Sequence, residues 1–163
     1  MIIGFIAYPW QKERDHDLKL REEHRVAITT FFEASETFFA KLKVAAFNRT
    51  APLPDDDYAK LEAAKASLAL RSDDALINAC SELAQHLRDY RNKVKLCRED
   101  KATKETRDAR DEAYKRANEA RIEALICSRD TLSEAVQTQP TTRTLRAFFF
   151  MSSDASSEEG TTK

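Results

Sequence analysis

Glycine and proline are scarce in this sequence of 163 residues, which contains only two glycines and four prolines. Sheets, hairpins and phosphate-binding loops need the backbone angles that these two residue types favour. The glycines lie near the two ends of the chain, at Gly4 and Gly160, so no P-loop, dinucleotide fingerprint or nucleophile elbow can form between them. The scarcity excludes most folds and predicts a small number of long helices.

The sequence also lacks an excess of charge of one sign. Lys and Arg number 27 and Asp and Glu number 28, a formal net charge of -1. No global field therefore attracts a polyanion, and we expect no binding to nucleic acid. Charged residues make up 34% and hydrophobic residues 42% of the chain, a composition typical of a folded helical domain.

Cysteine and histidine are few, and their spacing fits no metal site. The three cysteines are too far apart for a disulfide framework or for paired zinc ligands, and no HExxH or ExxH pattern occurs. Each cysteine falls on an apolar helix stripe, where burial raises the pKa of a thiol. We expect no metal, no cofactor and no catalytic residue. The cysteines are Cys80, Cys97 and Cys127, and the histidines are His16, His24 and His86.

The first ten residues, MIIGFIAYPW, carry no charged side chain, and the charged segment QKERDHDLKLREEHR follows directly. A membrane-crossing helix needs about 20 apolar residues, so residues 1–10 cannot span a bilayer alone. One interpretation makes them the exit half of a membrane anchor, and the other makes them an apolar end that packs on the domain. The order of aromatic and then basic residues favours the first. The predicted membrane-interface residues are Tyr8, Trp10, Lys12 and Arg14.

Helical patterns continue through residues 11–138, which we take as one domain. A long Phe-rich helix is predicted from Gln11 to Arg49, and the turn NRTAPLPDDD separates it from a short helix that ends near Leu70. Ser72 or Asp73 then caps a third helix. Its apolar stripe has alternating spacings of four and three. The stripe comprises Leu76, Cys80, Leu83, Leu87, Tyr90, Val94 and Cys97.

The fold predicted from these patterns is all-α: an antiparallel bundle of about four helices, with a long first helix, a short second helix and a long helical hairpin. The hairpin turns near Asp100 to Thr103, and its fourth helix packs through small side chains from Ala113 to Ala124. Ile122, Leu125 and Ile126 add larger apolar side chains toward its end. The alternative is one continuous helix from Asp74 to Val136, roughly 95 Å long.

Two segments are predicted to contact a protein partner. The first is the charged hairpin tip, residues 98–112, where acidic residues interleave with the basic ones and cancel their field. The second lies in the tail, residues 139–163, where an apolar island at 145–151 precedes an end that is disordered by composition. The candidate partner-binding residues are Lys101, Lys104, Arg107, Arg110, Phe148, Phe149 and Phe150.

The apolar head, the charged exit, the Phe-rich helix and the segments SDDALINACSELAQHL and NEARIEALICSRDTL together resemble a loose group of uncharacterised bacterial proteins. Proteins of this group have one N-terminal membrane helix and a small cytoplasmic helical domain. The resemblance covers residues 1–136 and implies a membrane anchor with the helical domain at the cytoplasmic face of the inner membrane. It carries over no catalytic residue, and the apolar head is shorter than the anchor of the group.

We therefore expect a non-enzymatic, membrane-proximal helical domain that mediates protein–protein interaction or scaffolding, with a homo-oligomer as one form. One alternative is a soluble cytoplasmic adaptor or accessory subunit of a larger complex. Another is a small ligand-binding or enzymatic bundle that uses His24 or His86. We interpret His24 instead as a residue at the edge of the core with one ring nitrogen satisfied.

Overall fold

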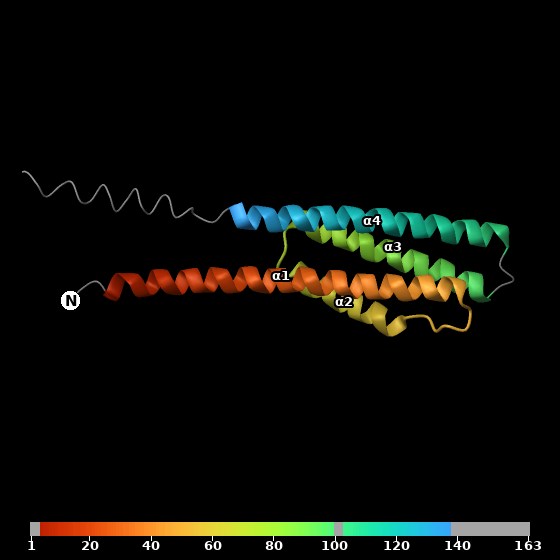
Figure 1. The fold of residues 1–163 in the computed structure, drawn as a ribbon, viewed down its shortest axis with the longest axis horizontal. Coiled ribbons are helices and arrows are strands. Elements are labelled where there is room, and N and C mark those ends of the chain that lie inside the picture. Colours follow the sequence, from red (N-terminus) through yellow and green to blue (C-terminus); the bar gives the residue numbers. More distant parts are fainter. Residues whose placement is uncertain (1–3, 100–102, 138–163) are drawn as a thin grey trace, which may run out of the picture. The chain divides into compact units, whose positions relative to one another are not determined.

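The structure, a computed structural model, describes residues 4–99 and 103–137, and the side chains of residues 12–99 and 103–133. These residues form four α-helices: α1 (Gly4–Phe47), α2 (Asp55–Ala69), α3 (Asp74–Glu99) and α4 (Lys104–Gln137). No strand occurs among them. The predicted all-α bundle, with a long first helix, a short second helix and a helical hairpin, is confirmed (Figure 1).

The third and fourth helices form a hairpin, and the continuous-helix alternative is wrong. α3 ends at Glu99 and α4 begins at Lys104. The Cys97 thiol donates to the Thr106 carbonyl at 3.2 Å, and farther from the turn the rings of Tyr90 and Tyr114 lie 5.7 Å apart. A single straight helix would separate these pairs. The hairpin instead buries the α3 stripe, which a continuous helix would leave in water.

Contacts between rings and charges fix the directions of the helices. α2 runs antiparallel to α1, because Lys41 contacts Asp57 and the rings of Phe38 and Tyr58 lie 5.5 Å apart. α3 runs parallel to α1, since His24 bonds to Ser72 just before α3 and Arg49, just after α1, donates to the Cys97 carbonyl near the end of α3. α4 returns beside α1 and α3 (Figure 1).

The apolar stripe predicted for α3 is buried at every position. Its seven residues pack against large side chains from α1 and α2 and against small side chains from α4. The small side chains of α4 at this contact are alanines, which let α4 approach α1 and α3 closely. The partners that are almost completely buried are Phe31, Phe38, Leu42, Leu61, Leu68, Ala117 and Ala124.

α1 differs from the prediction at its start. The helix begins at Gly4 instead of Gln11 and runs through Pro9. Because Pro9 lies near the start of the helix, its missing N–H interrupts the hydrogen-bond ladder only in the first turns. Leu20, which was expected on the buried stripe, is 50% exposed, and burial begins at Ala27. The bundle ends at the level of His24, whose Nε2 lies 2.9 Å from Ser72 Oγ between α2 and α3. Leu20 lies beyond that level and is therefore exposed.

An aspartate side chain caps α3 but not α2. Asp73 caps α3, because its Oδ1 accepts a bond from the Leu76 N–H at 2.8 Å. The N-cap of α2 is Pro54, which makes no side-chain cap bond. Asp55, Asp56 and Asp57 fill the first turn of α2 instead, where their charge still favours the helix dipole.

Candidate interaction surface

A groove follows the line where α1 and α2 meet. Three adjoining hollows make up this α1–α2 groove, with volumes of about 250, 570 and 470 Å³. The first two share Thr30 and Ser67, and the last two share Asp57. The groove therefore extends from Glu22 to the 51–57 segment. At 1.5 Å per residue, the α1 wall from Glu22 to Val44 is about 33 Å long.

Small side chains line the middle of the groove. Ala34 and Ala64 lie low between the helices, and Thr30, Thr37 and Ala63 are exposed along its sides. Short side chains at these positions let another helix backbone approach closely. The middle of the groove therefore has a shape that suits a helix.

Larger apolar side chains stand exposed near both ends of the groove. Val26 is 53% exposed and Leu70 is 82% exposed at one end. Val44 is 58% exposed at the other, beside Pro52. Isolated exposed apolar residues are common on soluble proteins, but here they flank a single groove at both of its ends.

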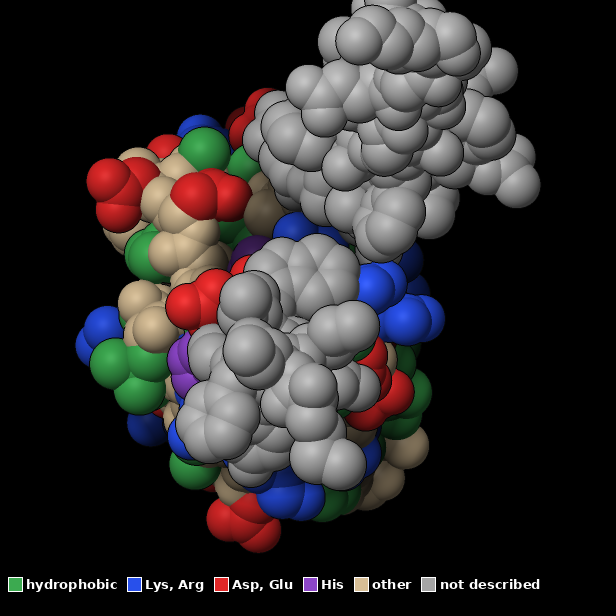
Figure 2. All heavy atoms as spheres, turned by 90° about the vertical axis from the view of Figure 1, so that its left-hand side faces the viewer, with side chains coloured by type: hydrophobic (Ala, Val, Ile, Leu, Met, Phe, Trp, Pro, Cys, Tyr) green, Lys and Arg blue, Asp and Glu red, His purple; other side chains and the backbone are tan. Residues whose placement is uncertain are grey.

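Charges of opposite sign face each other across the groove. In the first hollow, Glu22 and Glu23 on α1 lie opposite Arg71, which follows α2. In the last hollow the signs are reversed: Lys41 on α1 lies opposite the aspartates of the α2 first turn. Seen from the end where α1 begins, the coloured side chains likewise mix both signs around the bundle (Figure 2).

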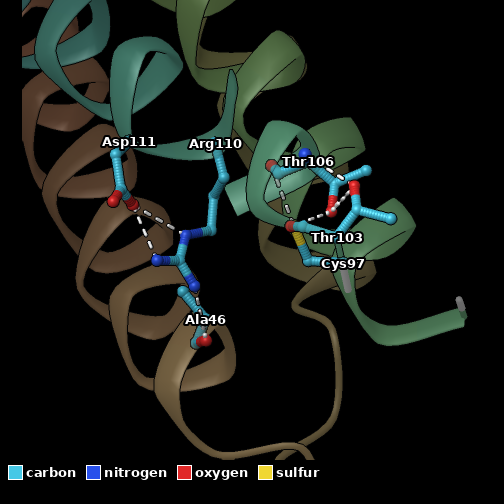
Figure 3. A network of polar contacts seen from close by, with 6 residues as sticks. All are labelled: Ala46, Cys97, Thr103, Thr106, Arg110 and Asp111. Carbon is cyan, nitrogen blue, oxygen red and sulfur yellow. Dashed lines mark hydrogen bonds and ion pairs between the residues drawn. The ribbon is translucent and has the colours of Figure 1, made fainter. Parts of the chain in front are cut away.

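Two arginine side chains at the hairpin tip, Arg98 and Arg110, are bound within the protein. Arg110 donates to the Ala46 carbonyl at 3.4 Å and pairs with Asp111 at 2.7 Å (Figure 3). It also lies over the ring of Phe47. Arg98 donates to the carbonyls of Arg49 and Ala51. Cations at these positions stabilise the C-terminal end of α1, where the carbonyls have no partner within the helix.

The candidate residues named from the sequence thus lie at several separate places. Lys12 and Arg14 are exposed on the first part of α1, and Lys104 and Arg107 are exposed at the tip. Arg110 is largely covered, with a side chain that is 16% exposed. Tyr8, Trp10, Lys101, Phe148, Phe149 and Phe150 lie outside the described side chains, as does the tail.

Sequence reasoning missed the groove, although a signal for it was present. Val26, Thr30, Glu33, Thr37 and Val44 repeat at spacings of four, three, four and seven on α1. This pattern marks a second helix face of intermediate polarity beside the buried one. The buried Phe-rich stripes are more apolar, so the prediction followed them and did not recognise the second face.

α4 shows the opposite error. Ile122, Leu125 and Ile126 were expected to add to the buried surface, but they are 48%, 39% and 56% exposed. The buried face of α4 instead continues through Ala124 and Ser128. Arg121, next to these residues, forms an ion pair with Glu36 of α1, which places the neighbouring side chains at the outer edge of the contact.

Two of the three thiols have a raised pKa. Burial raises the pKa of Cys80 to about 12, and partial burial together with Asp73 and Asp130 raises the pKa of Cys127. A protonated thiol is a poor nucleophile, so the described geometry gives these two cysteines no activated thiolate. Cys97 is buried and donates to a carbonyl. His24 has one ring nitrogen bonded to Ser72, as expected.

Among the described residues, no group of three or more His, Cys, Asp or Glu side chains is arranged to hold a metal ion. In the same part of the chain, no helix combines the length and the hydropathy that crossing a membrane requires. Comparison of the chain with protein-family models, curated proteins and solved structures found no match.

Proposed function

We propose that this protein is a non-enzymatic helical domain that binds other protein chains through the α1–α2 groove. The observation that carries the proposal is the groove itself: a run of small side chains, with exposed apolar residues at both ends and paired charges along its walls. Helix-in-groove recognition uses surfaces of this kind, with apolar anchors at helical spacing. The inward-turned arginines of the hairpin tip make the groove a better contact surface than the tip.

The same proposal places the domain next to a membrane, at the cytoplasmic face of the bacterial inner membrane. Its support is the uncharged head MIIGFIAYPW, followed by Lys12 and Arg14, together with the resemblance to bacterial proteins that have one membrane helix. Residues 12–23 are exposed on all sides, as expected of a charged stalk between an anchor and a bundle. A soluble adaptor would use the same groove without the membrane.

Site-specific photocrosslinking tests the binding role of the groove. A photoreactive amino acid replaces Ala63, which lines the groove, or Ala109, which is exposed on α4. In bacterial cells, position 63 is expected to give discrete crosslinked protein bands and position 109 none. Equal crosslinking at both positions, or none at either, would overturn the proposal.

Membrane fractionation tests the location separately. The full chain is expected to sediment with membranes, and a chain that lacks residues 1–10 is expected to stay in the supernatant. Both chains keep the bundle, because the described core begins at Ala27. If both chains partition alike, the N-terminal segment has no role in membrane association.

A further inference from the structure

The α1–α2 face is complementary to itself, level by level along the groove. Because α1 and α2 are antiparallel, each position on one helix lies beside a fixed position on the other. Contacts between Lys41 and Asp57 and between Phe38 and Tyr58 set this register. It places Val26 near the end of α2 and Val44 near its start, in agreement with the side chains that line the hollows.

In this register, α1 and α2 carry charges of opposite sign at the same level, and the signs are reversed between the two ends of the groove. At the Val26 level, α1 carries Glu22 and Glu23, and the α2 side carries Arg71. At the Val44 level, α1 carries Lys41 and the α2 side carries the three aspartates. The Lys41 side chain is 55% exposed although it is bound to Asp57, which leaves room for a second carboxylate.

Apolar residues on the α1 side and the α2 side also lie at the same levels. Val26 on α1 is matched by Leu70 at the end of α2, and Val44 is matched by Pro52 and Leu53 before α2. Between these ends, the exposed Thr30 and Thr37 of α1 are level with Ser67 and Lys60. At each level, the side chains on the α1 side of one copy are therefore complementary in charge or apolar character to those on the α2 side of a second copy.

We infer that a second copy of this chain occupies the α1–α2 groove, related to the first by a two-fold axis parallel to the groove. Such an axis places α1 of one copy on α2 of the other and keeps every level in register. Glu22 then meets Arg71 of the second copy, Lys41 meets its exposed aspartates at the start of α2, and Val26 meets its Leu70. An isologous interface requires this self-complementarity. The inference rests on the proposed function, because it names the occupant of the same groove.

The size of the face suits a modest but specific dimer. The strip of α1 that lines the groove from Glu22 to Val44 is about 33 Å long and that of α2 is about 22 Å long at the helical rise. At about 10 Å of width per helix, each copy contributes roughly 550 Å². The total of about 1,100 Å² is close to the smallest area of specific protein interfaces, as expected of a weak dimer.

Membrane geometry also favours this axis. A two-fold axis parallel to the helices brings both N-termini to the same end of the dimer, so both heads reach one membrane. An axis perpendicular to the helices would send them to opposite ends. Only the parallel axis is compatible with a dimer whose two copies are both membrane-proximal.

A charge-swap experiment tests the dimer. The full chain, in a mild nonionic detergent, is studied by sedimentation velocity as wild type, Glu22→Arg, Arg71→Glu and an equimolar mixture of these two variants. Each variant alone places two like-charge contacts in the dimer, which is expected to raise the dissociation constant about tenfold. In the mixture, both contacts join opposite charges again, so association is expected to return to within about threefold of wild type.

The control is Glu119→Arg on α4, which changes the net charge by the same amount as Glu22→Arg but outside the groove, and is expected to leave the dissociation constant unchanged. Circular dichroism verifies that each variant is folded. A monomeric wild type, or variants whose mixture shows no recovery, would overturn the dimer. Crosslinking of other proteins at position 63 together with a monomeric wild type would reject the second copy and keep the proposed binding function, whereas a monomer without crosslinks would reject both.

Discussion

Lys41 Nζ lies 2.7 Å from Asp57 Oδ2, and this ion pair joins the later turns of α1 to the first turn of α2. The Asp57 residue is only 8% exposed, and Lys60 approaches its other oxygen at 3.9 Å. The aspartate thus stabilises the start of α2 and holds this helix in register along α1. The α1–α2 groove depends on that register.

Replacing Asp57 with Asn is expected to lower the free energy of unfolding by about 1–3 kcal/mol. The substitution removes both ion-pair contacts and leaves polar atoms in a nearly buried position. Urea denaturation followed by circular dichroism measures the effect. Asp56→Asn is the matched control, because Asp56 is exposed in the same helical turn, and it is expected to cost less than about 0.5 kcal/mol. Equal losses in the two variants would show that helix dipole alone accounts for the effect.

Two leucines of α3 test the burial of its stripe. Leu87 is 1% exposed and Leu96 is 47% exposed. Leu87→Ala is expected to lower the unfolding free energy by about 2–5 kcal/mol, because the truncation leaves a cavity in the core. Leu96→Ala is expected to cost below about 1 kcal/mol. Thermal or urea unfolding of both variants measures the difference, and similar losses would contradict the described packing of α3.

The sequence predicted α3 well because a single strong pattern decides its burial. Its stripe from Leu76 to Cys97 keeps alternating spacings, and burial of one face follows directly from that spacing. The hairpin was predicted for a related reason: a continuous helix would leave the same stripe in water. Local chemistry also gave Asp73 as one of two candidate caps, with Ser72, and His24 as a residue at the edge of the core.

The remaining features depend on which helix covers which surface, and one sequence does not encode this locally. Leu20 is exposed because the bundle ends at His24, and Ile126 is exposed because alanines make the contact of α4. The groove arises because α2, with 15 residues, covers only part of α1. Its wall residues, such as Thr30 and Thr37, are ordinary helix-surface residues until α2 is placed beside them.

Asp73 links two separate contacts that mutation can distinguish. Its Oδ1 accepts the Leu76 N–H at the start of α3, and its Oδ2 accepts the Thr131 hydroxyl of α4 at 3.2 Å. Asp73→Ala is expected to cost about 1 kcal/mol, typical of a lost N-cap, with a further few tenths from the α4 contact. Thr131→Val keeps the cap, removes the second bond together with the bond from the Thr131 hydroxyl to the Cys127 carbonyl, and is expected to cost less. Urea titration of the two variants provides the comparison, and a larger loss for Thr131→Val would mean that the cap contributes little.

Tyr90 makes stability depend on pH in the alkaline range. Burial raises the pKa of its phenol from 10.0 to about 12, so between these values the folded chain holds a proton that the unfolded chain has released. Its contribution is therefore complete below pH 10 and is lost as the pH rises toward 12. Two pKa units correspond to about 2–3 kcal/mol. Unfolding free energies measured across this range are expected to fall more steeply for the wild type than for Tyr90→Phe.

Cys80 contributes to the same alkaline loss, because burial raises the pKa of its thiol from 9.0 to about 12. Its contribution is present in both the wild type and Tyr90→Phe, so the difference between their slopes isolates the phenol. Tyrosinate absorbance of the folded wild type provides an independent readout. The pKa of Tyr58 is also raised, chiefly by burial, so the part of the late titration that disappears in Tyr90→Phe is expected to report the Tyr90 phenol. Parallel slopes with an unchanged absorbance titration would mean that Tyr90 is accessible to water, contrary to its 2% exposure among Phe39, Tyr114 and the α3 core.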